Sequence, residues 1–121
     1  MNTRRMNGDT LEVLNGKNVI ISLTEKLVNK EMHISVSGEI KNEVAHEFED
    51  ELMASFSVCN VVKLDLSKVT YIASIAMRAL LSVQQIIDEN KDAVLLITSM
   101  SPEVKEMFDS AGFLDILNIE E

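Results

Sequence analysis

The side chains that could do chemistry in this 121-residue chain are few and widely spaced. The two histidines, His33 and His46, lie in no His/Cys/Asp spacing that resembles a zinc site. Cys59 is the single cysteine, so it can form neither an internal disulfide nor a zinc pair. Asp65 and Asp88 could serve acid–base chemistry, but nothing in their spacing is distinctive. We therefore expect a protein without catalytic activity, metal or cofactor.

Glycine-rich phosphate-binding loops are nearly excluded, because the chain has four glycines and no Gly-rich loop before a helix.

The position of one serine in the chain suggests a chemical role for it. Ser74 follows the apolar segment 61–66 and a turn near residues 69–71, and we predict it as a helix N-cap. Free N–H groups and the helix dipole favour negative charge there, so a phosphate on Ser74 would be tolerated. The simpler interpretation is that Ser74 only caps the helix.

Composition limits the class of protein. A chain of 121 residues has room for one domain with a single core. The net charge of −9 argues against binding nucleic acid and favours a partner with a basic patch. No apolar run approaches the ~18 residues of a membrane span, and residues 1–8 lack the apolar stretch of a signal peptide. We expect a soluble, cytoplasmic protein in which Cys59 is buried and reduced.

Hydrophobic periodicity predicts the elements that must position these residues. Two strands that pair as a hairpin are expected in residues 18–36, where a β-branched run precedes an alternating segment. Four-residue apolar spacing predicts a helix over 44–56, and further helices are expected over 74–90 and from Pro102 to Ala111, with Ser101 as N-cap and Gly112 as the stop. Strands are expected at 61–66 and 93–98, and a last strand or apolar tail at 114–119. Residues 1–17 are either a frayed extension or an extra edge strand.

Several of these segments together resemble the STAS domain family, which includes bacterial anti-sigma factor antagonists and the tails of sulfate transporters. The segments that carry the resemblance are Val-Ser-Gly-Glu-Ile at 36–40, Leu-Asp-Leu-Ser-Lys-Val-Thr-Tyr-Ile at 64–72 and the stretch 101–113, which is similar to the family's last helix and glycine stop. The resemblance runs from Asn18 to Ile119 in family-like order. It implies an α/β fold with a four- to five-stranded mixed sheet and three to four helices mainly on one face. Residues 18–121 would be the domain and residues 1–17 an addition to it.

The resemblance also implies partner switching, in which the unphosphorylated domain binds an anti-sigma factor that is a serine kinase, and phosphorylation ends the binding. The family motif Asp-Ser-Ser/Thr-Gly-Leu corresponds here to residues 73–77, which puts Ser74 at the phosphoacceptor position. Ala73, Ile75 and Ala76 depart from that motif, and Lys41 stands where many members have Asp.

The expected partner surface joins two segments, and its residues are Gly38, Glu39, Ile40, Lys41, Ala73, Ser74, Ile75, Ala76, Met77 and Arg78. The expected partner is an anti-sigma factor kinase or another protein, and the chain is expected to be a monomer or weak homodimer. Two alternatives stay open. The chain could be a fixed scaffold subunit of a sensory or transporter complex, independent of phosphorylation, or a small enzyme or ligand carrier whose pocket the sequence does not reveal.

Overall fold

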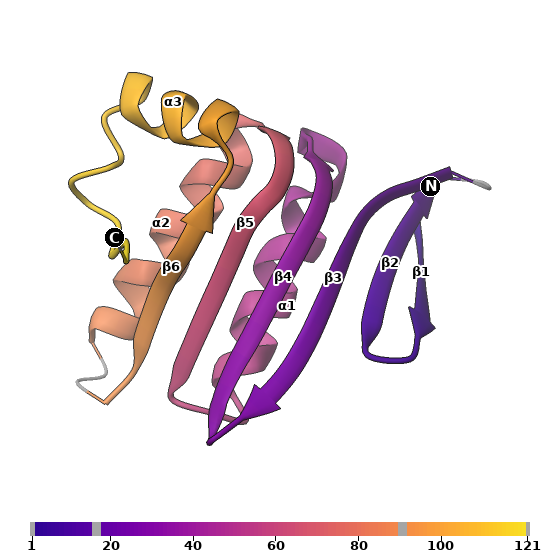
Figure 1. Ribbon diagram of the computed structural model, residues 1–121, viewed down its shortest axis with the longest axis horizontal. Coiled ribbons are helices and arrows are strands. Elements are labelled where there is room, and N and C mark those ends of the chain that lie inside the picture. The colour runs from indigo at the N-terminus through magenta and orange to yellow at the C-terminus, as the bar shows by residue number, and fades with distance from the viewer. Residues whose placement is uncertain (1, 16–17, 90–91, 121) are drawn as a thin grey trace.

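Six strands form one sheet, in which each strand pairs with the strand next to it in the chain (Figure 1). The computed structural model describes residues 2–15, 18–89 and 92–120. The first four strands, β1 (Asn2–Asn7), β2 (Thr10–Asn15), β3 (Asn18–Val28) and β4 (Glu31–Ile40), are antiparallel neighbours. Strands β5 (Val61–Ile72) and β6 (Val94–Met100) continue the sheet in parallel with β4. The sheet is therefore mixed, as expected.

Helices connect the parallel strands, because a parallel pair needs a long crossover. A 3₁₀ turn, η1 (Asn42–Val44), and helix α1 (Ala45–Phe56) lead from β4 to β5, and α2 (Ser74–Asp88) leads from β5 towards β6. Helix α3 (Pro102–Ser110) follows β6. Figure 1 shows α1 and α2 behind the sheet and α3 near the end of β6. The helices thus lie mainly on one face, as the resemblance implied.

The core lies between that face of the sheet and the helices. Alternate side chains of the strands are buried, as the period of two requires. The largest fully buried side chains are Phe48, Phe108, Ile21, Leu23, Ile34, Ile40, Leu52, Leu64, Leu66, Ile72, Leu80 and Leu95. Residues between them, such as Thr24, Ser35 and Asp65, lie on the opposite face and line a shallow depression there. No helix in the described part of the chain covers this polar face.

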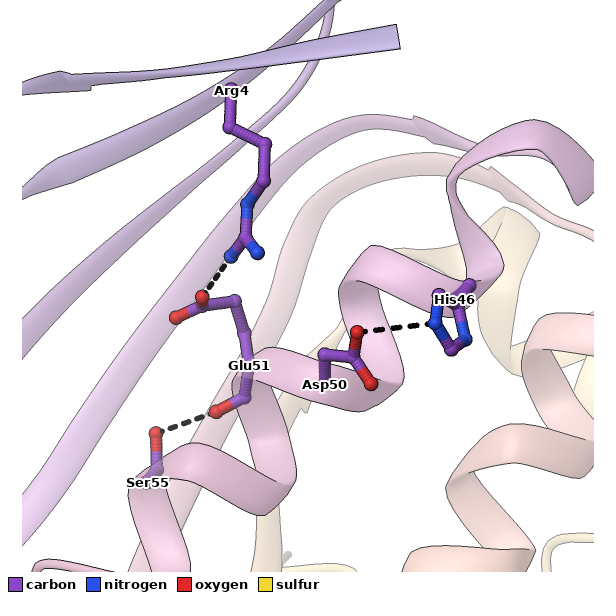
Figure 2. A network of polar contacts seen from close by, with 5 residues as sticks. All are labelled: Arg4, His46, Asp50, Glu51 and Ser55. Atoms are coloured by element: carbon purple, nitrogen blue, oxygen red, sulfur yellow. Dashed lines mark hydrogen bonds and ion pairs between the residues drawn. The ribbon is translucent and has the colours of Figure 1, made fainter.

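The hairpin of β1 and β2 raises the number of strands above the expected four or five. Its apolar residues Leu11 and Val13 are 5% and 0% exposed, so it extends the core. Arg4 on β1 contacts Glu51 on α1 through an ion pair (Figure 2). Residues 2–15 thus form two strands at one end of the sheet, where we expected a frayed extension or one extra edge strand.

Two local predictions were wrong. Strand β5 does not end at Leu66, because the predicted turn at 69–71 is strand that pairs with β4, Gly38 with Val69 and Glu39 with Tyr71. Register shifts in this pairing break the alternation, which made the segment resemble a turn. Ser74 is not the N-cap of α2 but its first helical residue, because Ala73 keeps the extended backbone of the strand and occupies the cap position.

The C-terminal third follows the predictions more closely. Ser101 caps α3 by accepting a hydrogen bond from the Val104 N–H, and Pro102 is the first helical residue. Helix α2 ends at Asp88, and the predicted end at Asn90 lies outside the described residues. Residues 114–119 form no separate strand beyond one bridge between Ile97 and Ile119, although Leu117 is buried.

Candidate functional site

The two halves of the predicted partner surface meet where β4 and β5 end. Ile40 pairs with Ile72, and the Ala73 N–H donates a 2.8 Å hydrogen bond to the Ile40 carbonyl. Since α2 begins at the next residue, Ser74, this bond holds the start of α2 beside residues 38–41. Two segments more than thirty residues apart in sequence therefore form one surface.

Gly38 has a structural role within this surface. Its φ of +112° lies in a region that residues with side chains rarely adopt. A Cβ at this position would lie 2.5 Å from the carbonyl oxygen of Ile20 on the neighbouring strand β3. Glycine is therefore required here so that β3 and β4 can approach each other while the pairing of β4 with β5 shifts by one residue.

The ten predicted residues divide by exposure. Four are buried and shape the surface from below: Ile40, Ala73, Ala76 and Met77. Gly38 is partly exposed, and five side chains face solvent: Glu39, Lys41, Ser74, Ile75 and Arg78. Ile75 is 52% exposed, which is high for a large apolar side chain at the start of a helix. The part that a partner can touch is thus one apolar side chain among polar and charged ones.

Three shallow depressions surround the start of α2. The first has a volume of about 740 Å³ and includes Glu39, Lys41 and Tyr71. The second, of about 610 Å³, lies between α2 and α3 and includes Ser74. The third, of about 370 Å³, lies between α1 and α2 and includes Ile75 and Arg78. The surface is therefore not flat, and the start of α2 lies between its depressions.

Lys41 and Glu39 form an ion pair on this surface. The Lys41 ammonium lies 3.1 Å from a carboxylate oxygen of Glu39. The hydrogen bond to Glu39, followed by the negative charge of Glu39, raises the pKa of Lys41. Lys41 therefore stays charged at neutral pH, and Glu39 partly offsets its charge.

The start of α2 has no compensating group of its own. No side chain caps it, and no acidic residue lies in its first turn. The first N–H groups of a helix have no partner within the helix and carry partial positive charge. Ser74 is exposed at this end, so its hydroxyl lies where an added negative charge would be favoured.

The candidate chemical residues serve local contacts, and of them His46 lines the depression between α1 and α2 together with Ile75 and Arg78. His46 lies 3.2 Å from Asp50 along α1, as Figure 2 shows, and His33 lies 3.8 Å from Glu31. The Cys59 thiol lies within hydrogen-bond distance of backbone carbonyls, and the Asp65 and Asp88 carboxylates accept hydrogen bonds from the Ser67 N–H and the Gln84 amide. Within the described residues, no three His, Cys, Asp or Glu side chains are arranged to hold a metal.

Sequence reasoning missed the contribution of α3. Glu103, Glu106, Met107 and Ser110 line the same depression as Ser74. Their spacing puts them on one face of a helix, and this pattern was readable in the sequence. Their position beside Ser74, however, depends on how α3 packs against the sheet.

Comparison with known proteins gives the following. Residues 17–121 match the family model described as STAS domain. An anti-sigma factor antagonist from Mycobacterium paratuberculosis has a structure with a TM-score of 0.73 at 19% identity, covering 82% of this chain and 84% of its own. A putative anti-sigma factor antagonist from Thermotoga maritima gives 0.72 at 20% identity, with 82% and 86% covered.

A third structure is the Bacillus cell fate determinant SpoIIAA in its phosphorylated form, with a TM-score of 0.61, 9% identity and 82% and 91% of the chains covered. These likenesses show a shared fold. No curated protein matches the chain. In the described residues, no helix has both the length and the apolar character needed to cross a membrane.

Proposed function

The chain belongs to the STAS domain family, and on that premise we propose that it is an anti-sigma factor antagonist, which acts by binding an anti-sigma factor. In this proposal residues 18–121 are the family domain and residues 1–17 an addition to its sheet. The observation that carries it is the hydrogen bond from the Ala73 N–H to the Ile40 carbonyl. This bond joins both halves of the docking surface, by which we mean residues 38–41 and 73–78.

The chemistry of the docking surface supports protein binding. Ile75 is half exposed and has Arg78 one helical turn away, and both line the depression between α1 and α2. An apolar side chain beside a cation is a common centre of protein interfaces, in which Arg is enriched. The buried residues beneath it, Ala73 and Ala76, fix its position.

The binding test uses the purified chain and the anti-sigma factors of its source organism. We expect Ile75→Asp and Arg78→Glu each to weaken binding at least tenfold. The first puts a charge in place of the exposed apolar side chain, and the second reverses the charge beside it at the centre of the docking surface. Val58→Asp is the matched control, since Val58 is 69% exposed beyond the other end of α1. Calorimetry measures the affinities. If Val58→Asp weakens binding as much as Ile75→Asp, the docking surface is elsewhere.

Regulation of the docking surface by phosphorylation of Ser74 is the second part of the proposal. The hydroxyl is exposed at a helix start that has no side-chain cap and no acidic residue in its own first turn, which favours a phosphate. We expect intact-mass analysis to find one phosphate after incubation with ATP and the cognate kinase, and none on Ser74→Ala. If the wild type binds the kinase but stays unmodified, the switch is refuted and the docking function remains.

If the chain binds the kinase but is not phosphorylated, a fixed scaffold subunit of a sensory or transporter complex is the favoured function. The observation that supports this alternative is the apolar character of the switch turn, in which Ala73 and Ala76 are buried and Ile75 follows Ser74 directly. A scaffold would bind its complex equally well with Ser74, Ala or Glu at position 74, so the same series of variants distinguishes the two functions.

A further inference from the structure

The depression between α2 and α3 adds a third element to the docking surface. It is lined by Tyr71, Ile72, Ser74, Met77, Glu103, Glu106, Met107, Ser110 and Ala111. Helix α3 is held beside the start of α2 by Ser101, whose buried hydroxyl caps α3 and also donates a hydrogen bond to the Val69 carbonyl on β5. The walls of the depression are therefore fixed to the sheet.

The charge of this depression has a single sign. Glu103 and Glu106 are exposed on its α3 side, and none of the residues that line it is Lys, Arg or His. The other two depressions around α2 each contain a cation, Lys41 in one and Arg78 in the other. The docking surface is thus acidic at its α3 end and mixed elsewhere.

Methionines supply the apolar part of the depression. Met77 is 6% exposed and contributes to its α2 side, and the partly buried Met107 contributes from α3. Methionine side chains are flexible and polarisable, so they adapt to different apolar groups. A long side chain with an aliphatic stem and a cationic end, such as Arg or Lys, matches this combination.

We propose that the depression between α2 and α3 receives a basic segment of the protein partner, in which an Arg or Lys side chain packs on Met77 and Met107 and pairs with Glu103 and Glu106. This inference rests on the proposed function, because it assigns the partner's charge at the same docking surface. Helix α3 then selects partners by charge, and Ile75 with Arg78 supplies the central contact. The net charge of −9 acts in the same direction, since it attracts basic partners from a distance.

The first test compares two double variants that remove the same charge. Glu103→Gln/Glu106→Gln removes two negative charges from the depression. Asp88→Asn/Glu89→Gln is the control, because it removes two negative charges at the C-terminal end of α2, away from the depression. The probe is a twelve-residue peptide of Arg and Leu, and the same peptide with Glu in place of Arg is its counterpart. Amide chemical shifts of the whole chain report where each peptide binds.

We expect the Arg peptide to shift the amides around Met77, Met107 and Ser110, and the Glu peptide to leave them unchanged. Glu103→Gln/Glu106→Gln is expected to weaken Arg-peptide binding at least fivefold, and the control pair less than twofold. Equal losses would mean attraction by net charge alone and would overturn the inference. Glu106→Gln alone, outside the first turn of α3, guards against a helix weakened at its start.

The second test uses the anti-sigma factor and separates the inference from the proposed function. If Ile75→Asp abolishes binding and the α3 pair leaves it unchanged, α3 does not select the partner while the docking function stands. If neither variant changes binding, the docking function itself fails. Loss of affinity in both, with the loss from the α3 pair reduced at high salt, supports the inference.

Discussion

At the scale of single residues, Gly38 is the position where the proposed docking surface depends on backbone geometry. We expect Gly38→Ala to destabilise the fold by about 3 kcal/mol, because the new Cβ would meet the Ile20 carbonyl oxygen 2.5 Å away at a φ of +112°. Gly8→Ala is the control, since Gly8 has a φ of +63° but nothing within 4 Å of its Cβ position. It should cost only about 1 kcal/mol. Urea unfolding measures both values, and equal losses would show that the contact with Ile20 is unimportant.

Ser74 allows a second prediction at this scale. Because α2 has no acidic residue in its first turn, Ser74→Glu should stabilise the helix by roughly 0.3–1 kcal/mol through the dipole. Ser82→Glu, at an exposed position in the middle of α2, should give no comparable gain. Thermal unfolding compares the variants. A gain that appears only after Glu103 and Glu106 are neutralised would mean that repulsion within the depression outweighs the dipole.

At the scale of elements, the hairpin of β1 and β2 is tied to the rest of the fold by three charged groups. Arg4 on β1 pairs with Glu51 on α1, as Figure 2 shows, and the Glu25 carboxyl group on β3 interacts with that of Glu51. Burial raises the pKa of Glu25 to about 7, with smaller contributions from its interaction with Glu51 and from the charge of Glu51, while the charge of Arg4 acts in the opposite direction. Two carboxyl groups therefore share one site under the hairpin.

The raised pKa of Glu25 predicts how stability changes with pH. The folded state holds a proton that the unfolded state releases near pH 4.5, so this contribution to stability is complete below that pH and is lost as the pH rises through about 7. Because Glu25 is partly exposed, solvent screening reduces the expected loss to about 1 kcal/mol. Urea unfolding between pH 4 and 8 measures it.

Glu25→Gln should remove most of this slope, since the amide has no proton to lose. Glu12→Gln, on the neighbouring strand β2, is the control, because Glu12 pairs with Arg5. If both variants keep the slope of the wild type, the proton that links pH to stability is held by another group.

Periodicity predicted the elements that have regular patterns. The helices α1 and α2 and the strands β4 and β6 were identified because their apolar residues recur at helical or strand spacing. The β1–β2 hairpin was missed as a pair of strands because Arg4, Arg5 and the flanking asparagines give it no continuous apolar run. The second half of β5 was missed because its register shifts hide the alternation.

Only those parts of the candidate site that have a local sequence pattern could be predicted. Residues 38–41 and 73–78 are contiguous segments with recognisable motifs, so the sequence alone could single them out as a candidate site. Glu103, Glu106 and Met107 join the same surface only because Ser101 holds α3 against β5, and such tertiary contacts leave no local pattern. Which of the ten predicted residues are buried also depended on the packing of α2.

At the scale of the whole molecule, we expect the domain to fold without the hairpin and the hairpin to add stability to it. Removal of residues 1–17 takes the buried Leu11 and Val13 from the core, which we expect to cost about 3 kcal/mol. It also leaves β3 as an unprotected edge, so the shortened chain should self-associate as its concentration rises. Urea unfolding and light scattering measure the two effects. A shortened chain with the stability of the full one would mean that the hairpin adds nothing to the core.

The order of the strands has a consequence for how the chain acquires its structure during synthesis. Each strand pairs with the one made just before it, so no strand has to insert between two that are already in place. The first four strands need only antiparallel turns, and contacts that are near in sequence form quickly. The sheet can therefore grow in one direction while the chain leaves the ribosome. The acidic depression between α2 and α3 is completed late, because α3 follows all six strands in the chain.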